Sequence, residues 1–370
     1  MKKSILFVIN TLGRGGAEAA LATLLEHLEP DEYDLDLYVM VGQGDLIHRI
    51  PDYVNVLNKK FDDADVLDKE GKRRLMWHLF ESILNVGSLT LNTPYLLSNY
   101  HAMRKAGRVQ YDKLLWKSIS DSAPRFKKEY DLAVAYLEGA STYYVSKYVK
   151  AKKKASFVHI DYEMSGYTPA LDHGCFDAFD KIFCVSQEVR DSFLRVYPQY
   201  AEKTDISHNL VDKDRILERA EEPGGFDDDF SGRRILTVAR LHRQKALEVS
   251  IEAMRIVKDH GYAARWYVLG EGDERSFLES QIRKLGLTDD FILCGTRENP
   301  FPYYRQCDLY VHCSRFEGRS IAIQEAEILG CPIIVSDCPG NREQVIHEKN
   351  GLIVNFQCGG NRRCRHAYVR

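Results

Sequence analysis

The sequence predicts an α/β protein built from two doubly wound, parallel-sheet domains. Its 370 residues exceed one ordinary domain and suit two of about 150–200 residues each. Short apolar, strand-like runs alternate with helix-like runs at the lengths of parallel βαβ units. An acidic segment with Gly and Pro, AEEPGGFDDDFSG at 220–232, has the composition of a linker. We expect one domain over 1–205, a second over 206–357, and a short tail over 358–370.

The first half begins with a strand, a glycine-rich turn, a helix and a second strand, in the runs SILFVIN, TLGRGGAE, AEAALATLLEHL and YDLDLYVMV. The two lysines before the first run suggest a signal peptide. However, Asn10, Arg14 and Glu18 interrupt its apolar character and no small-residue cleavage site follows, so we interpret it as a buried strand. Three later runs are rich in β-formers: DLAVAYL, KASFVHI and KIFCVS. Residues 71–128 carry no strand signal and predict a mostly helical insertion.

The second half repeats the alternation from about residue 233. The expected strands are RRILTVAR, ARWYVLG, DFILCG, CDLYVHCS and CPIIVS. The expected helices are ALEVSIEAMRIVKDHG, ended by Gly261, ERSFLESQIRKLG, ended by Gly286, and SIAIQEAEILG. We therefore expect two Rossmann-like halves around a cleft.

The composition excludes several classes of protein. Hydrophobic residues make up 44% of the chain, enough to bury two cores, and the net charge of −3 argues against a generally basic nucleic-acid binder. No run of about 18 apolar residues predicts a membrane span. The nine cysteines form no CxxC pair, and several lie in apolar runs, as Cys184, Cys294 and Cys331 do. This pattern is typical of reduced cytoplasmic thiols rather than of disulfides or a metal site.

Two glutamates stand at the mouth of an expected helix near residue 320. Ligands of open parallel sheets bind beyond the carboxyl ends of the strands, and Glu317 and Gly318 follow the expected strand CDLYVHCS. Gly318 lets a ligand approach the backbone, and Ser320-Ile321 opens a helix whose free amides favour an anion. Glu325 lies one turn inside this helix. Carboxylates accept paired hydrogen bonds, which suits the diol of a ribose or hexose, although both side chains are also compatible with a solvated surface.

A basic pair follows the strand RRILTVAR. Arg240 ends this run and Lys245 precedes the next helix, so a guanidinium and an ammonium meet at a place suited to a diphosphate. Two ordinary surface cations remain the alternative. The loops LGEGDE, with Gly270, and CGTRENP, with Thr296 and Arg297, also follow expected strands.

Taken together, these motifs resemble the second domain of retaining, GT-B-fold glycosyltransferases of family 4, the glycosyl transferases group 1. The resemblance rests on Glu317-x7-Glu325, the Arg240/Lys245 pair, LGEGD, CGTRENPFPYYRQCDLYVHCSRFEG and GCPIIVSDCPGNREQVIHEKNGLIV. In the first half, NTLGRGGAE is similar to the family's glycine loop and FVHID to its histidine segment. VSQEVRDSF and ISHNLVD are similar to the approach to the interdomain hinge. The resemblance covers residues 4–354.

The resemblance implies roles for four residues that hold or activate a nucleotide-sugar donor, linked to UDP or GDP. Glu325 is expected to hold the ribose and Glu317 a hydroxyl of the donor sugar. Arg240 and Lys245 are expected to neutralise the departing diphosphate. Because these cations replace a magnesium ion, the resemblance implies no metal and no further cofactor. It also implies transfer with retention, in which the leaving phosphate deprotonates the acceptor hydroxyl.

It further assigns donor contacts on both halves. Gly15 and Gly16 are expected to let the first loop close over phosphates and sugar, and His159 to face the sugar as part of the catalytic set. Thr296 and Arg297 are expected near the base. The remaining expected donor contacts are Gly270, Gly318, Arg319, Ser320 and Ile321.

The chain departs from the family pattern at two places. Ala246 stands where a glycine is usual after the lysine, and Arg319-Ser320 replaces an aromatic residue and a proline, which leaves the donor sugar open. Three alternatives are also open: an inactive protein that binds nucleotide sugars, a GT-B sugar-nucleotide epimerase, and an NAD-dependent oxidoreductase. The last is disfavoured because GRGGAE lacks the full G-x-G-x-x-G pattern and the second strand ends without an acid.

Residues 71–128 combine positive charge with apolar side chains. They hold eleven Lys/Arg against three acids, a net +8, together with Trp77, Phe80, Leu114, Leu115 and Trp116. Such a segment either lies on an anionic leaflet or forms a solvated helical lobe over the first sheet. The first possibility predicts a cytoplasmic protein peripheral to the inner face of the membrane. Its acceptor is then a lipid-linked glycan in cell-surface polysaccharide assembly, with no nucleic-acid partner.

The chain changes character after NGLIVNF. Residues 357–370, QCGGNRRCRHAYVR, hold two cysteines, two glycines, four arginines and a histidine, with no apolar period of 2 or 3.6. We expect a disordered tail and a second domain that lacks its closing helices.

Overall fold

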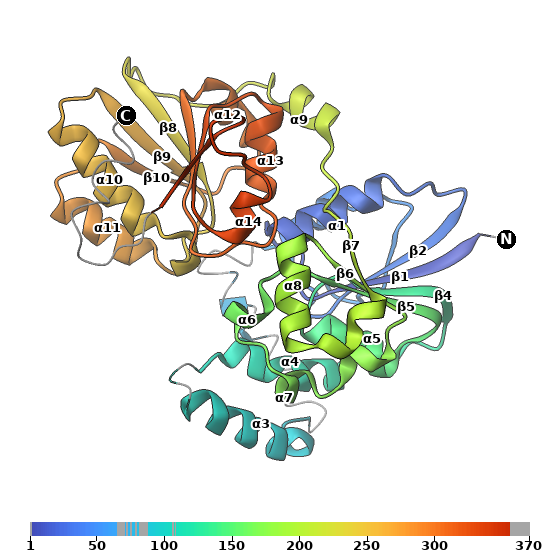
Figure 1. The fold of residues 1–370 in the computed structure, drawn as a ribbon. Helices are drawn as coiled ribbons and strands as arrows, with labels where there is room; N and C mark the ends of the chain where they lie inside the picture. The colour runs from blue at the N-terminus through green and yellow to red at the C-terminus, as the bar shows by residue number, and fades with distance from the viewer. Residues whose placement is uncertain are drawn as a thin grey trace. The chain divides into compact units, whose positions relative to one another are not determined.

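The structure is a computed structural model that describes residues 2–64, 71, 73, 74, 76, 77, 80, 88–105, 107 and 109–355. The chain divides into two compact units, Met1–Leu210 and Val211–Arg370. Each is built on one parallel sheet (Figure 1). The α/β architecture of two doubly wound domains is therefore confirmed.

The first unit contains a seven-stranded sheet in the order β3-β2-β1-β4-β5-β6-β7. Every neighbouring pair is parallel. The strands are β1 (Lys3–Ile9), β2 (Tyr33–Val39), β3 (Asn55–Val56), β4 (Glu129–Ala135), β5 (Lys150–Val158), β6 (Lys181–Cys184) and β7 (Thr204–Ile206). The α-helices within the described residues of this unit are α1 (Gly16–Glu26), α3 (Ser88–Lys105), α4 (Tyr111–Ser122), α5 (Ala140–Tyr148), α6 (Tyr162–Ser165), α7 (Pro169–Asp172) and α8 (Gln187–Val196).

The second unit contains a six-stranded parallel sheet in the order β10-β9-β8-β11-β12-β13. The strands are β8 (Arg233–Val238), β9 (Ala264–Leu269), β10 (Phe291–Gly295), β11 (Leu309–His312), β12 (Ile333–Ser336) and β13 (Leu352–Val354). The α-helices are α9 (Lys213–Arg219), α10 (Leu247–Asp259), α11 (Arg275–Lys284), α12 (Phe301–Gln306), α13 (Ile321–Ile328) and α14 (Pro339–Arg342). Counted within the unit, the strands run 3-2-1-4-5-6, which is the Rossmann order.

Successive residues on the central strands of the second sheet pack alternately against the helices on its two faces. Ile235 and Trp266 pack with α10 and α11, whereas their neighbours Leu236 and Tyr267 pack with α9, α12 and α13. Because successive side chains of a strand point to opposite faces, helices on both faces require strands that are apolar throughout. This explains why the central strands read as continuous apolar runs.

The long elements agree with the sequence prediction, and the short ones were missed. Gly261 and Gly286 lie in the left-handed region, with φ of 78° and 64°, where the two preceding helices end as predicted. Strands β3 and β7 have two and three residues, too few for a periodic signal. Helices α5, α6, α7, α8, α9, α12 and α14 were also not predicted, and each has ten or fewer residues.

The acidic segment 220–232 is not the boundary between the units. The division falls at Leu210/Val211, so this segment belongs to the second unit. There Asp228 accepts hydrogen bonds from Arg234 on β8 and from Arg265 and Tyr267 on β9. Asp228 therefore holds the segment against β8 and β9, because both of its carboxylate oxygens accept hydrogen bonds from side chains of these strands.

The described part of the insertion is mostly helical, and part of its apolar surface is buried. Leu114 is buried, and Leu115 and Trp116 pack against the core of the first unit. These three side chains therefore cover the first sheet, as the alternative of a helical lobe predicts for them. Trp77 and Phe80 are exposed. Within the described residues, none of the helices has the length and apolarity needed to cross a bilayer. The predicted disordered tail, 357–370, lies outside the described residues.

Candidate functional site in the second unit

The candidate site lies at the carboxyl ends of the two central strands, β8 and β11. These strands are neighbours in the sheet although β9, β10 and three helices separate them in the sequence. The connections from β8 and β11 lead to helices on opposite faces, since α10 and α13 pack in different core clusters. Loops that leave a sheet in opposite directions open a crevice between them, where ligands of doubly wound sheets bind.

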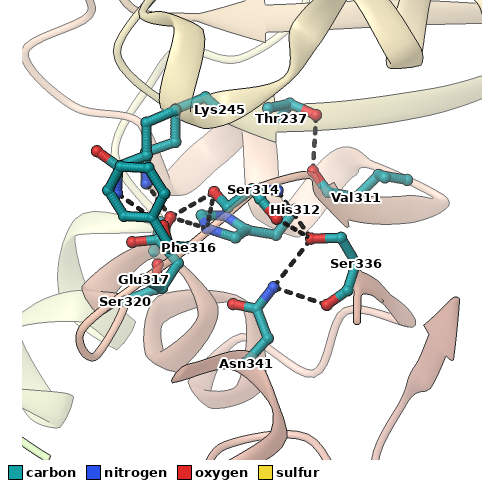
Figure 2. A network of polar contacts seen from close by, with 12 residues as sticks. Thr237, Lys245, Val311, His312, Ser314, Phe316, Glu317, Ser320, Ser336 and Asn341 are labelled. Atoms are coloured by element: carbon teal, nitrogen blue, oxygen red, sulfur yellow. Dashed lines mark hydrogen bonds and ion pairs between the residues drawn. The ribbon is translucent and has the colours of Figure 1, made fainter. Parts of the chain in front are cut away.

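Backbone contacts hold the two loops together. The amide of Arg315 donates to the carbonyl of Gln244 at 2.8 Å, and the Gln244 side chain donates to the carbonyl of Phe316 at 2.8 Å. Between them, Lys245 Nζ donates to Glu317 Oε1 (Figure 2). The structure therefore brings together two of the predicted site residues, one from each loop.

Glu317 is a buried carboxylate that stays ionised. Its Oε1 accepts from Lys245, from Ser314 Oγ and, at 3.0 Å, from His312 Nε2 (Figure 2). Burial alone raises the pKa of Glu317, but the Lys245 charge and the hydrogen bond from His312 outweigh it and hold the pKa well below its usual range. The site thus contains a fixed negative charge beside a fixed positive charge.

A second set of contacts anchors the Glu317 loop to the neighbouring β12 loop. The amide of Ser314 donates to Ser336 Oγ at 2.8 Å, and Asn341 donates to the Ser336 carbonyl at 3.0 Å. A Cβ on Gly340 would lie 2.5 Å from the carbonyl oxygen of Glu317, so only glycine permits this approach. The carboxylate is therefore held from two sides, which limits the positions that its loop can adopt.

The glycines of LGEGD support the β8 loop. Gly270 has φ of 140°, and a Cβ there would lie 2.1 Å from the carbonyl oxygen of Ala239; one on Gly272 would lie 2.2 Å from that of Leu241. The β9 loop can therefore pack directly under the backbone that carries Arg240. In this structure Gly270 and Gly272 therefore allow close packing of the backbone.

The departure at residue 246 is accommodated without loss of the turn. Ala246 adopts φ of 47° and ψ of 35°, a left-handed conformation that favours glycine. Its methyl group is fully buried in the second core. The resulting turn places Lys245 directly before α10.

The other expected donor contacts of this unit lie at the same edge of the sheet. Arg240 and Arg297 are exposed after β8 and β10, and Thr296 and Arg319 are partly buried. Glu325 lies on α13, and its Oε2 accepts from Tyr304 Oη at 3.0 Å. Gly318 and Ser320 are buried in the loop that leads to Ile321, the first residue of α13.

Sequence reasoning missed His312 and Tyr304, which contact the two glutamates. Little in the sequence marks them. His312 is a histidine at the end of an expected buried strand, and Tyr304 is one of several tyrosines that precede an expected strand. His312 is 1% exposed, and both burial and the nearby Lys245 charge lower its pKa. Its ring is therefore neutral at neutral pH.

The expected residues of the first unit lie at the carboxyl edge of their own sheet. Gly15 precedes α1, and a Cβ there would lie 2.2 Å from the Glu18 carboxylate; Gly16 is the first residue of α1. His159 follows β5, and burial lowers its pKa to about 4. Its amide donates to Glu138 Oε2 at 3.1 Å, a buried carboxylate that sequence reasoning also missed.

Part of the chain is similar to known glycosyltransferases. Residues 226–357 match the family model "Glycosyl transferases group 1". The Anabaena protein Alr3699/HepE, solved in complex with UDP-glucose, superposes with a TM-score of 0.64 and 16% identity, over 95% of this chain and 85% of that one. The chain has the GT-B fold.

Curated relatives match parts of this GT-B chain. An N-acetylgalactosaminyltransferase of Campylobacter jejuni, named for its diphospho-undecaprenol-linked substrate, is 30% identical over 153 residues, 41% of this chain and 40% of the relative. The amylovoran biosynthesis glycosyltransferase AmsK of Erwinia amylovora is 33% identical over 128 residues, 32% and 31% of the two chains. The first relatives thus align over less than half of their own length.

The described residues contain no group of three or more His, Cys, Asp or Glu side chains that could hold a metal ion. Seven cysteines in the same part of the chain are free thiols, and four of them are buried. The candidate site therefore consists of cations, carboxylates, hydroxyl groups and backbone amides. This set of groups can bind a phosphorylated, hydroxyl-rich ligand.

Proposed function

We propose that this chain is a glycosyltransferase that moves a sugar from a nucleotide-diphosphate donor to a hydroxyl of a glycan or lipid-linked glycan. The contact between Lys245 and Glu317 at the centre of the second sheet is the observation that supports this most strongly. It pairs a phosphate-binding cation with an acceptor of sugar hydroxyls where a doubly wound sheet binds its ligand. The contact also lies inside the segment that matches the glycosyltransferase model.

We assign donor contacts by charge and chemistry. Lys245 and Arg240 contact the diphosphate, Glu317 accepts from a hydroxyl of the sugar, and Glu325 accepts from the ribose. Without a donor, Glu317 balances the charge of Lys245. A diphosphate brings its own negative charge to Lys245, so the carboxylate of Glu317 can then turn its remaining acceptor sites to the sugar.

The transfer proceeds with retention and without a metal ion in this proposal. The acceptor oxygen forms a bond to the anomeric carbon on the face from which the diphosphate leaves. The electron pair of the broken bond goes to the phosphate oxygen, which also takes the acceptor's proton. Arg240 and Lys245 stabilise the negative charge that develops on the phosphate, a contribution that is large inside a partly dehydrated site.

A panel of UDP- and GDP-sugars tests the reaction class. We expect one donor to be consumed and its sugar to appear in a glycan or lipid-linked acceptor, with unchanged anomeric configuration and equal rates with and without EDTA. Donor binding without turnover would instead indicate an inactive binding protein. Conversion of the donor to its epimer without an acceptor would indicate an epimerase.

Two substitutions separate the roles of the glutamates. Glu325→Ala removes a charged hydrogen bond, so we expect donor binding to weaken by about 1.5–3 kcal/mol. Glu317→Gln keeps the shape but removes the charge that acts on the sugar, so turnover should fall more than donor affinity. Kinetics of both variants equal to those of the wild type would contradict the assignment.

We also propose that the protein binds the anionic inner leaflet and acts in cell-surface polysaccharide assembly. Arg73, Trp77 and Phe80 are exposed on the basic segment, which supports contact with anionic headgroups. Co-sedimentation with phosphatidylglycerol vesicles at low salt should therefore fall in the Trp77→Ser/Phe80→Ser variant. Tyr262→Ser, which removes an exposed aromatic ring from the second unit, is the control. Wild-type protein that stays in the supernatant would contradict the proposal.

A further inference from the structure

Two cysteines meet at the amino ends of two neighbouring strands of the second sheet. Cys307 lies two residues before β11, and Cys331 lies two residues before β12. These strands are parallel neighbours, with Tyr310 paired with Ile333. The two thiols therefore lie at the edge of the sheet opposite to the candidate site, which is at the carboxyl ends of the strands.

The thiols contact each other and share one hydrogen-bond acceptor. The Sγ atoms of Cys307 and Cys331 are 3.9 Å apart, and they lie 3.2 and 3.1 Å from the carbonyl oxygen of Tyr304. Tyr304 belongs to the last turn of α12, where carbonyl groups lack partners within the helix. Both S–H groups thus converge on a single backbone oxygen, which holds the two sulfur atoms side by side.

The backbone at this edge suits a covalent bond between the sulfur atoms. Neighbouring strands are about 4.8 Å apart, and disulfides join Cα atoms about 4.4–6.8 Å apart. The position of Cys331 is fixed by the turn that ends α13, in which Gly330 has φ of 72° and the Cys331 amide donates to the carbonyl of Ala326 at 2.9 Å. The remaining approach of the sulfur atoms, from 3.9 Å to about 2.0 Å, therefore requires side-chain rotation rather than a change of fold.

The two thiols are also open to reaction with a small molecule. Both side chains are only partly buried. The Cys307 thiol donates to the Cys331 sulfur, and this hydrogen bond lowers the pKa of Cys331. By contrast, burial raises the pKa of Cys338 to about 11. Because the thiolate is the reactive form of cysteine, Cys331 is the nucleophile of the pair.

We propose that Cys307 and Cys331 are a modification site, at which a low-molecular-weight disulfide converts the two thiols into a reversible intramolecular disulfide. The Cys331 thiolate attacks one sulfur of the reagent, which forms a mixed disulfide and releases one thiolate. Cys307 then loses its proton and attacks Cys331 Sγ, which forms the bond between the two cysteines and releases the second thiolate. The cysteines lose two electrons and two protons, and the reagent is reduced to two thiols.

The disulfide closes a loop around the segment that carries both glutamates of the candidate site. Residues 307–331 contain β11, the loop with Glu317 and helix α13 with Glu325. Closing this loop lowers the conformational entropy of the unfolded chain, so the oxidised protein resists unfolding more than the reduced protein. The bond forms at the opposite edge of the sheet and occupies no part of the candidate site. This inference does not depend on the proposed function.

Peptide mapping of the full-length protein tests the site. The protein is incubated with oxidised glutathione, its remaining thiols are alkylated, and it is digested with trypsin. We expect the peptide of residues 306–315 to be linked to the peptide of residues 320–342, and the link to disappear after treatment with dithiothreitol.

Four variants locate the bond, because each of these peptides contains a second cysteine. Cys307→Ser and Cys331→Ser should abolish the link. Cys313→Ser and Cys338→Ser are the matched controls and should retain it, since both of these side chains are 2% exposed and less accessible to the reagent. If a variant does not fold, fragment masses of the linked wild-type peptides identify the two bonded cysteines.

Thermal unfolding tests the effect of the bond. We expect the Tm of the oxidised wild-type protein to exceed that of the reduced protein by about 5 °C or more. Cys307→Ser retains the other eight cysteines, and its Tm should not rise after the same treatment. An equal rise in this variant would show that the bond between Cys307 and Cys331 is not the cause.

The other outcomes also decide the matter. Glutathione adducts on Cys307 or Cys331 without a linked peptide would overturn the proposal, because the thiols would then react without meeting. A link that persists in Cys307→Ser would overturn it too, since another cysteine would form the bond. A linked protein that binds no nucleotide would contradict the proposed donor and leave the modification site supported.

Discussion

Each unit holds a buried glutamate beside a histidine at the carboxyl ends of its central strands. The pKa values of the two glutamates are nevertheless shifted in opposite directions. Glu138, after β4, is 5% exposed, and burial raises its pKa to about 7. Glu317, after β11, is 7% exposed, and its pKa is lowered in spite of burial. Because the two side chains are buried to a similar extent, burial does not explain why their pKa values are shifted in opposite directions.

The contacting groups explain it. Glu317 accepts from the ammonium of Lys245 and from the His312 ring, whereas Glu138 accepts from the backbone amide of His159. A cation in contact offsets the desolvation of a carboxylate, whereas backbone amides and a more distant cation offset it only in part at Glu138. The second sheet therefore keeps a permanent charge at its centre, and the first keeps a carboxyl group that titrates near neutral pH.

The largest expected effect comes from removing the cation of the second unit. Lys245→Met leaves the Glu317 charge buried without its counter-ion, so we expect the free energy of unfolding to fall by about 3–5 kcal/mol in urea denaturation. Adding Glu317→Gln should recover part of the loss. Lys258→Met breaks an exposed pair with Asp290 and should cost less than about 1 kcal/mol. Equal losses in the two lysine variants would refute the comparison.

A smaller, pH-dependent effect is expected in the first unit. The folded-state pKa of Glu138 is raised from 4.5 to about 7, so its contribution to stability is fully present below pH 4.5 and is lost as the pH rises through 7. Glu138→Gln stays neutral and avoids this loss. Relative to wild type, its free energy of unfolding should therefore rise by up to about 3 kcal/mol between pH 4.5 and 8.

Glu317→Gln is the matched control for that titration. The pKa of Glu317 lies well below its usual range, so the carboxylate stays ionised over the whole interval. The difference between this variant and wild type should change by less than about 0.5 kcal/mol from pH 4.5 to 8, because only the unfolded-state carboxyl group still titrates near the lower limit. If this difference depended on pH as strongly as that of Glu138→Gln, Lys245 would not keep Glu317 ionised.

The smallest effects compare the turns that precede α5 and α10. Gly139 has φ of 90°, and a Cβ there would lie 2.7 Å from Trp116, so Gly139→Ala should cost about 1–3 kcal/mol in thermal unfolding. Ala246 already occupies its left-handed turn with a buried methyl group. Ala246→Gly relieves backbone strain, but it also removes a buried methyl group and raises the conformational entropy of the unfolded chain. Because these effects oppose each other, the free energy of unfolding should change by less than about 1 kcal/mol. Similar costs at both positions would show that the two turns are not constrained differently.

Local sequence patterns predicted the class of fold and most of the long elements. Apolar runs bounded by glycines placed β8 to β12 and helices α10, α11 and α13, because periodicity and helix-ending residues are local properties of a chain. It also singled out Lys245, Glu317 and Glu325, because their spacing resembles that of a known family. Roles in donor binding and transfer remain proposals for all three.

Which of these residues contact one another could not be predicted from local patterns. Lys245 and Glu317 are 72 positions apart, and their contact depends on β8 and β11 being neighbours in the sheet. Tertiary contacts also assign the acidic segment 220–232 to the second unit and bury His312 beside the carboxylate of Glu317. Strand order and the partners of buried polar groups arise from packing across the whole sheet, and no local pattern of residue types encodes them.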